Sequence, residues 1–268
     1  NHPRITKAIQ EQASTLIHCS NLYQIPEQEA LATKLCLLSN METVFFSNSG
    51  AEANEAAIKL ARLFGHNKGI EAPVIIVAEQ SFHGRTMATL SATGNRKVQA
   101  GFEPLLSGFA RVPYGDVEAV NQVALNNRNV VAIFIEPVQG EGGIQIPDPQ
   151  YLNKLKIITK NQDWLLMVDE VQTGMGRTGA WVAHQHNDIF PDVMTLAKGL
   201  GNGVPIGACL ARGKAAEILS PGTHGSTFGG NPLVSRAALA TIDAIESDSL
   251  TDRATFIGNA IAQGLRTN

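Results

Sequence analysis

Short apolar runs alternate with longer amphipathic segments along this chain, and that alternation limits the folds available to it. The runs 74–77, 129–135 and 165–168 are almost continuously apolar, which is typical of strands buried on both faces. Segments such as 50–64 and 232–245 carry apolar residues at helical spacing. We therefore predict an α/β fold with a mainly parallel central sheet and helices on both faces.

Proline signals mark two of the predicted helix starts. Asp148 before Pro149 and Asn231 before Pro232 each pair an N-cap residue with proline at the first helical position. Further elements extend the alternation over the whole chain. The other predicted helices lie within 1–18, from 26 to 38, and from 257 to the end; the other predicted strands are 44–46, 193–197 and 205–211.

Composition excludes several classes of protein. The 268 residues are 44% hydrophobic and 17% charged, with a net charge of −3, which fits a globular protein without a basic nucleic-acid or membrane surface. Cys19, Cys36 and Cys209 are far apart, and neither they nor the seven histidines show metal-ligand spacing. We therefore expect a cytoplasmic protein that acts on small molecules and has no disulfide framework or metal site.

Polar clusters follow the predicted strands at the point where each strand ends. In open α/β sheets, ligands bind at the carboxyl ends of the strands, so these clusters predict one shared site. The clusters are 47–55, 81–86, 136–143, 169–172 and the segment that begins at Lys198.

Lys198 ends an apolar run and is followed by Gly199, Gly201 and Gly203. A buried, unpaired ammonium is costly, whereas a neutral amine is a nucleophile suited to a Schiff base. The glycines leave room beside such an amine. The alternative is a lysine whose side chain extends from the strand end to solvent.

The turn Ser49-Gly50-Ala51 lies between a predicted strand and a predicted helix. Backbone N–H groups at that helix N-terminus could hold a phosphate. Ser49 followed by Glu52 also matches a capping box, which requires no ligand. Both interpretations remain open from this turn alone.

Two nucleotide-binding motifs are incomplete. Asp169 after an apolar strand resembles the acidic strand end of a phosphate-loop NTPase, but the G-x-x-x-x-G-K-[ST] loop is absent. Residues 174–179 match G-x-G-x-x-G, yet five residues separate them from the strand, and the next strand ends in a lysine rather than a ribose-binding acid. An NAD-binding dehydrogenase built on 174–179 remains the alternative from a different class.

Three side chains at 82–85 have both a functional and a structural interpretation. Phe82 could stack on a flat ring or belong to the core, and His83 could be a general base or a structural histidine. Arg85 could bind a carboxylate in a bidentate manner or lie on the surface. Together with a lysine, an acid and a phosphate-ready helix start, they suit pyridoxal phosphate, which requires those three groups.

The motifs together resemble the class-III (subgroup II) pyridoxal-phosphate-dependent aminotransferases over essentially all 268 residues. Asp169 and Lys198 are 29 residues apart (198 − 169), as in that family. The resemblance implies the large domain of aminotransferase fold type I. The matching segments are 48–55, 82–86, 136–143, 169–172, 197–199 and 225–232.

The resemblance also implies roles for individual residues. Lys198 would form the Schiff base and move protons, and Asp169 would pair with the pyridine nitrogen. Arg85 would bind a substrate carboxylate, and Glu141 resembles the residue that pairs with a C-terminal arginine of the family. The remaining implied contacts are Ser49, Gly50 and Ala51 with the phosphate, Phe82 and Val171 with the ring faces, His83 with the cofactor, Gln172 with the phenolic oxygen, Ser226 with the substrate, and Thr227 with the cofactor of a neighbouring subunit.

The expected reaction moves the distal amino group of N-acetylornithine to 2-oxoglutarate, a step of arginine biosynthesis, in a homodimer with shared sites. Succinylornithine, succinyl-diaminopimelate, ornithine and 4-aminobutyrate are alternative donors, and a mutase of the same fold is a more distant alternative. The expected organisation is a truncated N-terminal segment in 1–25, a large cofactor domain in 26–248 and the start of a truncated small domain in 249–268. The family's C-terminal arginine would lie beyond the chain, and a non-catalytic fragment is the remaining hypothesis.

Overall fold

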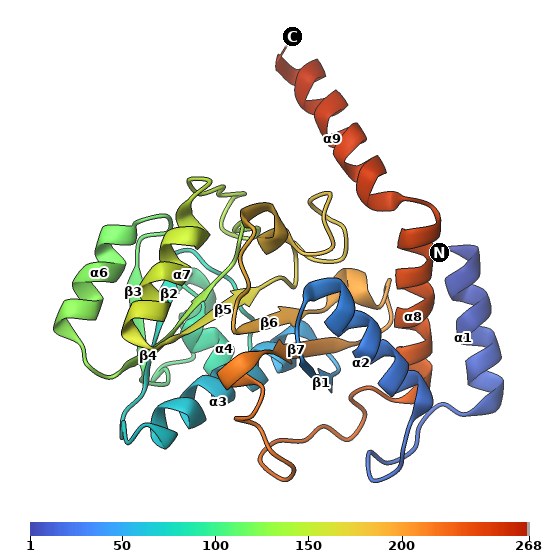
Figure 1. Ribbon diagram of the computed structural model, residues 1–268, viewed down its shortest axis with the longest axis horizontal. Coiled ribbons are helices and arrows are strands. Elements are labelled where there is room, and N and C mark those ends of the chain that lie inside the picture. The colour runs from blue at the N-terminus through green and yellow to red at the C-terminus, as the bar shows by residue number, and fades with distance from the viewer. Residues whose placement is uncertain (267–268) are drawn as a thin grey trace.

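The computed structural model describes residues 1–266, and a central sheet organises them (Figure 1). Within those residues the sheet has seven strands in the order β1-β7-β6-β5-β4-β2-β3. The strands are β1 (Thr43–Ser47), β2 (Val74–Ala78), β3 (Phe109–Val112), β4 (Val130–Ile135), β5 (Leu165–Asp169), β6 (Val193–Leu196) and β7 (Gly207–Ala211).

Strand direction brings most strand ends to one edge. β7 runs antiparallel to both neighbours, with Cys209 opposite Phe45 of β1 and Thr195 of β6, whereas the pairs β2–β3, β2–β4, β4–β5 and β5–β6 are parallel. The predicted mainly parallel sheet is confirmed. The carboxyl ends of β1, β2, β4, β5 and β6 therefore share one edge.

One face of the sheet is covered by α3 (Gly50–Asn67), α4 (Met87–Ala92) and the short α5 (Arg96–Gln99). Apolar residues of α3 at helical spacing, Ala53, Ala57, Leu60 and Phe64, are all buried. Ala57, Leu60 and Phe64 belong to a cluster that includes residues of β2, β4 and β5, because successive strand side chains point to opposite faces.

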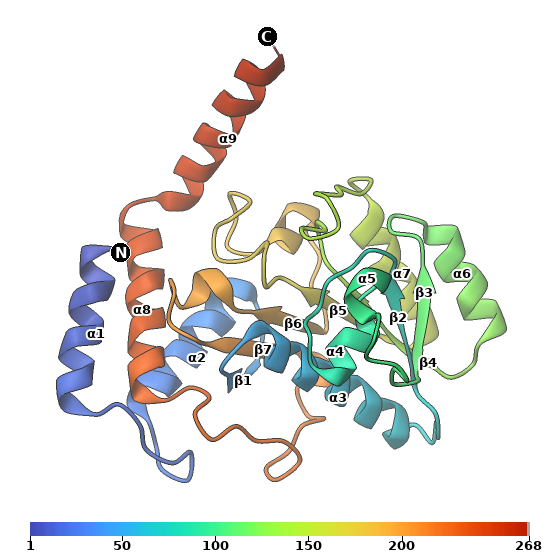
Figure 2. The same ribbon diagram turned by 180° about the vertical axis from the view of Figure 1, so that it is seen from behind.

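The other face carries two groups of helices. α6 (Val117–Asn126) and α7 (Tyr151–Gln162) cover the half formed by β2, β4 and β5, while α2 (Pro26–Ser39) and α8 (Pro232–Ser247) cover β1, β7 and β6. α1 (Pro3–Thr15) lies alongside α8, with Ile5 and Ala8 packed on Ala240 (Figure 2).

The last described helix, α9 (Leu250–Arg266), projects from the body of the molecule (Figure 1). It has no buried residue within the described chain, and Phe256, Ile261 and Leu265 are 73%, 58% and 76% exposed. The predicted helix is therefore present, although its apolar side is uncovered. Its predicted continuation through 267–268 lies outside the described residues. No helix within residues 1–266 combines the length and apolarity needed to span a bilayer.

Two local features differ from the sequence predictions. Helix α7 begins at Tyr151 with Gln150 as N-cap, so the predicted N-cap at Asp148 is wrong. Asp148 instead forms the turn before the helix, where its carboxylate accepts from Gln150 N and its carbonyl from Tyr151 N. The segment 87–126 contains β3 and three helices that were not predicted, because its sequence shows no strong periodicity.

Candidate active site

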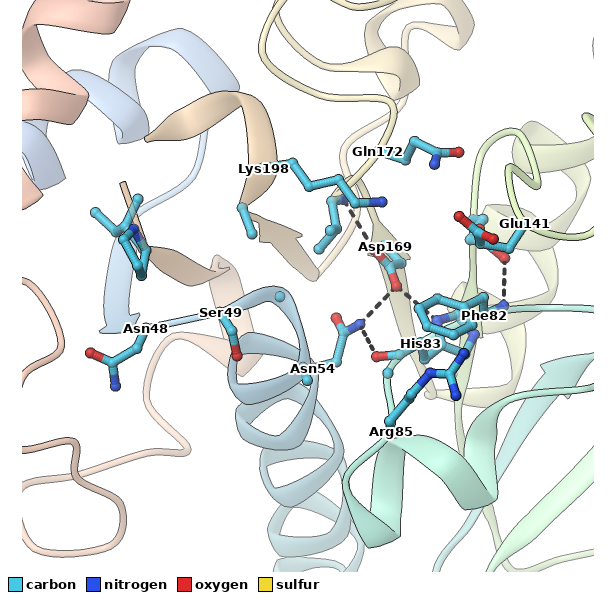
Figure 3. Close-up of a pocket in the computed structure, with 18 of the residues that line it drawn as sticks. Asn48, Ser49, Asn54, Phe82, His83, Arg85, Glu141, Asp169, Gln172 and Lys198 are labelled. Carbon is cyan, nitrogen blue, oxygen red and sulfur yellow. Dashed lines mark hydrogen bonds and ion pairs between the residues drawn. The ribbon is translucent and has the colours of Figure 1, made fainter. Parts of the chain in front are cut away.

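A cavity of about 460 Å³ opens at the shared carboxyl edge of the sheet (Figure 3). It is lined by residues from the ends of β1, β2, β4, β5 and β6, as the strand-end rule predicts. The predicted residues that it brings together are Ser49, Gly50, Ala51, Phe82, His83, Arg85, Glu141, Asp169, Val171, Gln172 and Lys198.

Asp169 is the most firmly held side chain of the pocket. It is 4% exposed, and its Oδ2 lies 2.8 Å from both Asn54 Nδ2 and His83 Nδ1. Its Oδ1 accepts from Val171 N at 3.0 Å. Asn54 also donates to the carbonyl of His83, so α3, the loop after β2 and the end of β5 all fix the carboxylate.

Lys198 follows β6 and begins the short 3-10 turn η2 (Lys198–Leu200). Of the two interpretations of its environment, a buried amine and a side chain that extends to solvent, the structure shows the second, because the side chain is exposed at the pocket. No hydrogen bond or ion pair within residues 1–266 holds its amine, and its backbone is left-handed with φ of 41°. In Figure 3 the side chain extends toward the side of the pocket where Asp169 and Phe82 lie.

The N-terminus of α3 faces the same pocket. Ser49 is the N-cap and accepts from Glu52 N at 3.2 Å, but Glu52 reaches back to Asn48 N, at 2.6 Å, rather than to Ser49 N. Half of the predicted capping box is therefore present: Ser49 caps Glu52 N, but the Glu52 carboxylate accepts from the residue before the N-cap. Within the described residues, the N–H groups of Gly50 and Ala51 have no acceptor, so a bound anion could take both.

Close packing fixes the position of Gly50 beside Val171. A Cβ at residue 50 would lie 2.8 and 3.0 Å from the two γ carbons of Val171 and 3.4 Å from the Cβ of Ala197. Only glycine fits there without moving Val171. The start of α3, the turn after β5 and the end of β6 therefore meet at one point of the pocket wall.

The loop after β2 supplies Phe82, His83 and Arg85. The His83 ring is 2% exposed and stacks on Phe134 with centroids 4.2 Å apart, which makes it a supporting residue behind Asp169. Phe82 is half-buried, and the exposed Arg85 guanidinium lies 6.0 Å from the centre of its ring. Arg85 is thus at the rim, where a substrate carboxylate could reach it.

The loop after β4 contacts the turn after β5. Glu141 is exposed at the pocket rim, and Gln172 packs its side-chain amide against Gly140, where a Cβ would lie 1.3 Å from Gln172 Oε1. A larger residue at 140 would displace the Gln172 amide from this position. Glu141 and Gln172 therefore lie on the same side of the cavity.

Ser226 and Thr227 do not reach this pocket. Ser226 lines a separate hollow of about 200 Å³, where its Oγ accepts from Asn48 Nδ2 and Gly229 N. Thr227 is exposed. The substrate contact predicted for Ser226 stays a prediction, as does the role predicted for Thr227 in a neighbouring subunit.

Asn54 and Glu136, two polar residues of the pocket, were not singled out from the sequence. Asn54 lies one helical turn after Gly50, and its amide anchors Asp169. Glu136 follows β4 as an acid at the end of an apolar strand, the same signal that identified Asp169. Burial raises the pKa of Glu136 to about 7; nearby His83 lowers it and Asp169 raises it further.

The segment 174–179 does not form a dinucleotide-binding turn. It lies in an irregular loop that leads to the 3-10 turn η1 (Ala183–Asn187), and a Cβ at Gly179 would contact Thr255 of α9. A Rossmann fingerprint requires a tight strand-to-helix turn, which is absent here.

Comparison with known proteins decides the family. The model of the family "Aminotransferase class-III" matches residues 1–268. The chain belongs to the class-III aminotransferases. It is 66% identical over 258 residues to the acetylornithine aminotransferase of Nitrosomonas europaea, covering 96% of this chain and 66% of that protein. It is 50% identical over 267 residues to the acetylornithine aminotransferase of Mycobacterium bovis, covering 98% of this chain and 65% of that protein.

Solved structures confirm the class-III aminotransferase fold. The ornithine aminotransferase of Toxoplasma gondii superposes with a TM-score of 0.95 at 36% identity, covering 99% of this chain and 64% of that one. The acetylornithine aminotransferase of Elizabethkingia anophelis gives 0.88 at 37% identity, covering 100% and 66%. This class-III aminotransferase chain thus spans slightly less than two thirds of these relatives' length.

The residues of the pocket suit the pyridoxal phosphate on which class-III aminotransferases depend. The fixed carboxylate of Asp169 can pair with a ring nitrogen, and the free N–H groups of Gly50 and Ala51 can hold a phosphate. The unpaired amine of Lys198 reaches into the same space, so the groups that the cofactor requires converge.

Proposed function

We propose that the protein is a pyridoxal-phosphate-dependent aminotransferase. One observation carries the proposal: the Lys198 amine, the Asp169 carboxylate and the N-terminus of α3 face one cavity of about 460 Å³. When bound there, pyridoxal phosphate supplies an aldehyde that captures amines and a ring that withdraws electrons.

Each residue has a defined task in this proposal. Lys198 Nζ would hold the cofactor and would move the proton at the substrate carbon. Asp169 would pair with the ring nitrogen, and Gly50 and Ala51 would bind the phosphate. Phe82 and Val171 would flank the ring, and Gln172 would donate to the phenolic oxygen.

We propose N-acetylornithine as the amino donor and 2-oxoglutarate as the acceptor. The support is the 66%, 54% and 50% identity to relatives named acetylornithine aminotransferase. Arg85 at the rim would bind a substrate carboxylate. Glu141, also at the rim, would pair with the C-terminal arginine of the family. The two half-reactions share one pocket, so a ping-pong order is expected.

A homodimer would complete this site. Ser226 and Thr227 lie outside the pocket of their own chain, in a segment exposed at Thr227, so they are available to a second copy. We also propose that 26–248 form the cofactor domain, flanked by an N-terminal segment and the start of a small domain. The free thiols of Cys19, Cys36 and Cys209 suit the cytoplasm.

The cofactor proposal is tested on the full-length protein with added pyridoxal phosphate. A visible absorption band is expected that borohydride removes, leaving the cofactor fixed on Lys198 in a peptide map. Lys198→Ala should lose the band and transaminase activity, whereas Lys160→Ala, a substitution on the exposed side of α7, should keep both. A wild-type protein without the band, or an active Lys198→Ala variant, would refute the proposal.

The substrate proposal requires a donor screen. N-acetylornithine with 2-oxoglutarate should give the highest kcat/KM, measured as glutamate formed, against succinylornithine, succinyl-diaminopimelate, ornithine and 4-aminobutyrate. A higher value for one of these would assign that donor instead. Turnover of an amine without any acceptor would indicate the mutase alternative.

A further inference from the structure

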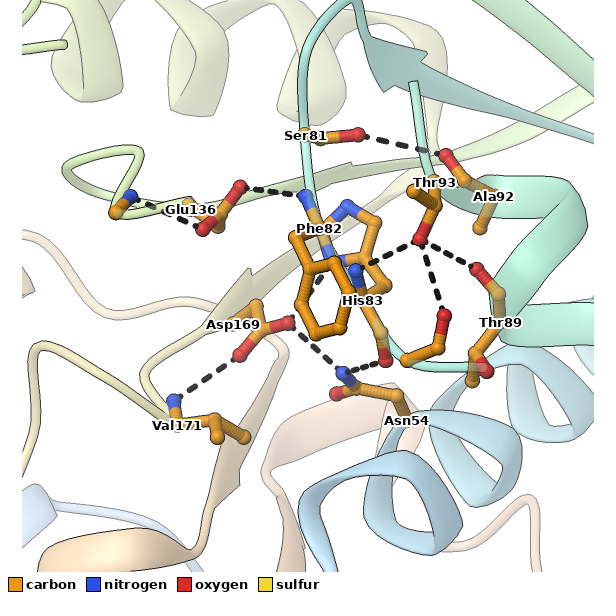
Figure 4. A network of polar contacts seen from close by, with 12 residues as sticks. Asn54, Ser81, Phe82, His83, Thr89, Ala92, Thr93, Glu136, Asp169 and Val171 are labelled. Atoms are coloured by element: carbon orange, nitrogen blue, oxygen red, sulfur yellow. Dashed lines mark hydrogen bonds and ion pairs between the residues drawn. The ribbon is translucent and has the colours of Figure 1, made fainter. Parts of the chain in front are cut away.

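Glu136 has no assigned role, yet its carboxylate is buried between two loops of the pocket. It follows β4, is 6% exposed and lines the cavity. Its Oε2 accepts from Phe82 N at 3.1 Å, and its Oε1 accepts from Gly140 N at 3.4 Å (Figure 4). Each oxygen therefore serves a different loop.

The first loop is tied to the molecule on several sides. Thr93 Oγ1 accepts from His83 N at 3.0 Å and donates to Thr89 O, which fixes the loop to α4. Asp169 holds the His83 side chain from β5. The bond from Phe82 N to Glu136 is the tie to β4, next to the ring that faces the cofactor space (Figure 4).

The second loop is the turn 140–143, closed at its base by paired backbone bonds between Gln139 and Gln145. Gln139 also donates to the carbonyl of Glu79 at 2.8 Å, so the two loops touch outside the pocket. Inside the pocket, Gly140 N to Glu136 is the bond that ties the turn to the end of β4, one residue before Glu141.

We propose that Glu136 is a positioning residue whose two carboxylate oxygens hold the Phe82 loop and the Glu141 loop in place across the pocket. The effect of these ties on binding rests on the proposed function, in which Phe82 would contact the cofactor ring and Glu141 would lie beside the substrate. A buried N–H that loses its acceptor is costly, so either loop would shift or open when the matching oxygen is removed.

The N–H bonds from Phe82 and Gly140 favour the ionised carboxylate, whereas burial favours the neutral acid. Protonation of Glu136 converts one acceptor oxygen into a donor and so breaks one of the two ties, although the folded chain as a whole binds that proton more tightly than the unfolded chain. The titratable groups that face it are His83 from the loop after β2 and Asp169 from the end of β5, while the Tyr114 hydroxyl donates to its backbone carbonyl. The raised pKa of about 7 puts this loss within reach of mild acid.

Amide hydrogen exchange on the full-length protein without cofactor tests the bridge directly. In Glu136→Gln, at least one of the Phe82 and Gly140 amides should exchange about tenfold faster or more, and in Glu136→Ala both should. Glu79→Gln removes an exposed carboxylate from the first loop and should leave both amides at their wild-type rates. Unchanged protection in the folded Glu136 variants would overturn the bridge.

A second measurement needs no variant. After correction for intrinsic rates, protection of Phe82 or Gly140 in the wild-type protein should be lower at about pH 6 than at about pH 8. Equal protection at the two pH values would also count against the bridge, even if every Glu136 variant failed to fold.

Pyridoxal-phosphate affinity, from an absorbance titration, tests the positioning role. Glu136→Gln should bind the cofactor about tenfold more weakly than wild type, and Glu79→Gln as tightly as wild type. A variant that loses protection but keeps full affinity overturns the positioning role. If the wild-type protein itself fails to bind the cofactor, the proposed function fails, while the exchange rates still decide whether Glu136 bridges the loops.

Discussion

Asp169 and Glu170 are neighbours in sequence, and the structure gives them opposite surroundings. Asp169 faces the cavity and is fixed by Asn54, His83 and Val171 N. Glu170 is fully buried and accepts from Thr173 Oγ1, the backbone N–H groups of Ala183 and His184, and the His184 ring. One acid serves the site, and the other holds the loop 173–184 against the sheet.

Asp169→Asn tests this division at the residue scale. The amide carries no charge and cannot present two acceptor oxygens to its three donors, so kcat should fall on the order of a hundredfold or more. The matched change Glu170→Gln should lower the free energy of unfolding by about 1–3 kcal/mol and leave cofactor affinity of the folded protein unchanged. Steady-state kinetics and denaturant unfolding of both variants make the comparison. Wild-type kinetics in Asp169→Asn would contradict the assignment.

At the scale of elements, α3 positions the proposed phosphate site. Its N-cap at Ser49 follows β1 after one residue, so the first turn of the helix opens at the carboxyl edge of the sheet. Its buried face, which includes Ala53, Asn54 and Ala57, fixes the rotation of the helix. The free N–H groups of Gly50 and Ala51 consequently point to the pocket rather than to the core.

Gly50→Ala should weaken cofactor binding about tenfold, because the new Cβ would push Val171, one wall of the pocket. An equilibrium titration with pyridoxal phosphate measures the effect. Gly258→Ala is the control for a glycine-to-alanine change in a helix: nothing lies within 4 Å of its Cβ, so affinity should stay the same. Equal affinities in both variants would show that the contact at Gly50 is dispensable.

Periodicity and strand-end position predicted much of the fold and site. The buried apolar runs predicted the strands of the central sheet. The rule that ligands bind at strand carboxyl ends predicted that Asp169, Phe82 and Lys198 lie at one edge. The antiparallel direction of β7 was not predictable, because pairing partners are not encoded in the period of a single strand. The sequence left open whether Lys198 is buried or exposed, since burial at a strand end depends on the loops that surround it.

Other misses have similar causes. The segment 87–126 divides into short elements, and short elements leave too few repeats to show a period. The return bond of Glu52 goes to Asn48 because the local loop brings that N–H closer, which sequence spacing cannot distinguish. Ser226 and Thr227 lie outside the pocket, and single-chain reasoning cannot say which copy they serve.

At the scale of the whole molecule, buried acids make folding depend on pH. Glu136 is the described pocket acid whose pKa is raised, from 4.5 to about 7, chiefly by burial. The folded chain therefore holds this proton more tightly than the unfolded chain. The stabilising contribution is fully present below about pH 4.5 and is lost as the pH rises through about 7.

Denaturant unfolding of wild type and Glu136→Gln should reveal that contribution. From about pH 5 to about pH 8, the wild-type free energy of unfolding should fall relative to that of Glu136→Gln by about 2–3 kcal/mol. Glu79→Gln should run parallel to wild type over the same range. A constant difference between wild type and Glu136→Gln would mean that this acid titrates alike in the folded and unfolded chains.

The left-handed backbone at Lys198, with φ of 41°, means that the molecule places its reactive amine at the expense of its own stability. A side chain in that conformation costs about 1–2 kcal/mol, and glycine avoids the cost. Lys198→Gly should therefore unfold at a higher denaturant concentration than Lys198→Ala, although neither can attach the cofactor. A less stable glycine variant would show that residue 198 carries no such strain. If the order holds, folding stability alone would favour glycine at this position, and the proposed attachment of the cofactor is what requires the lysine.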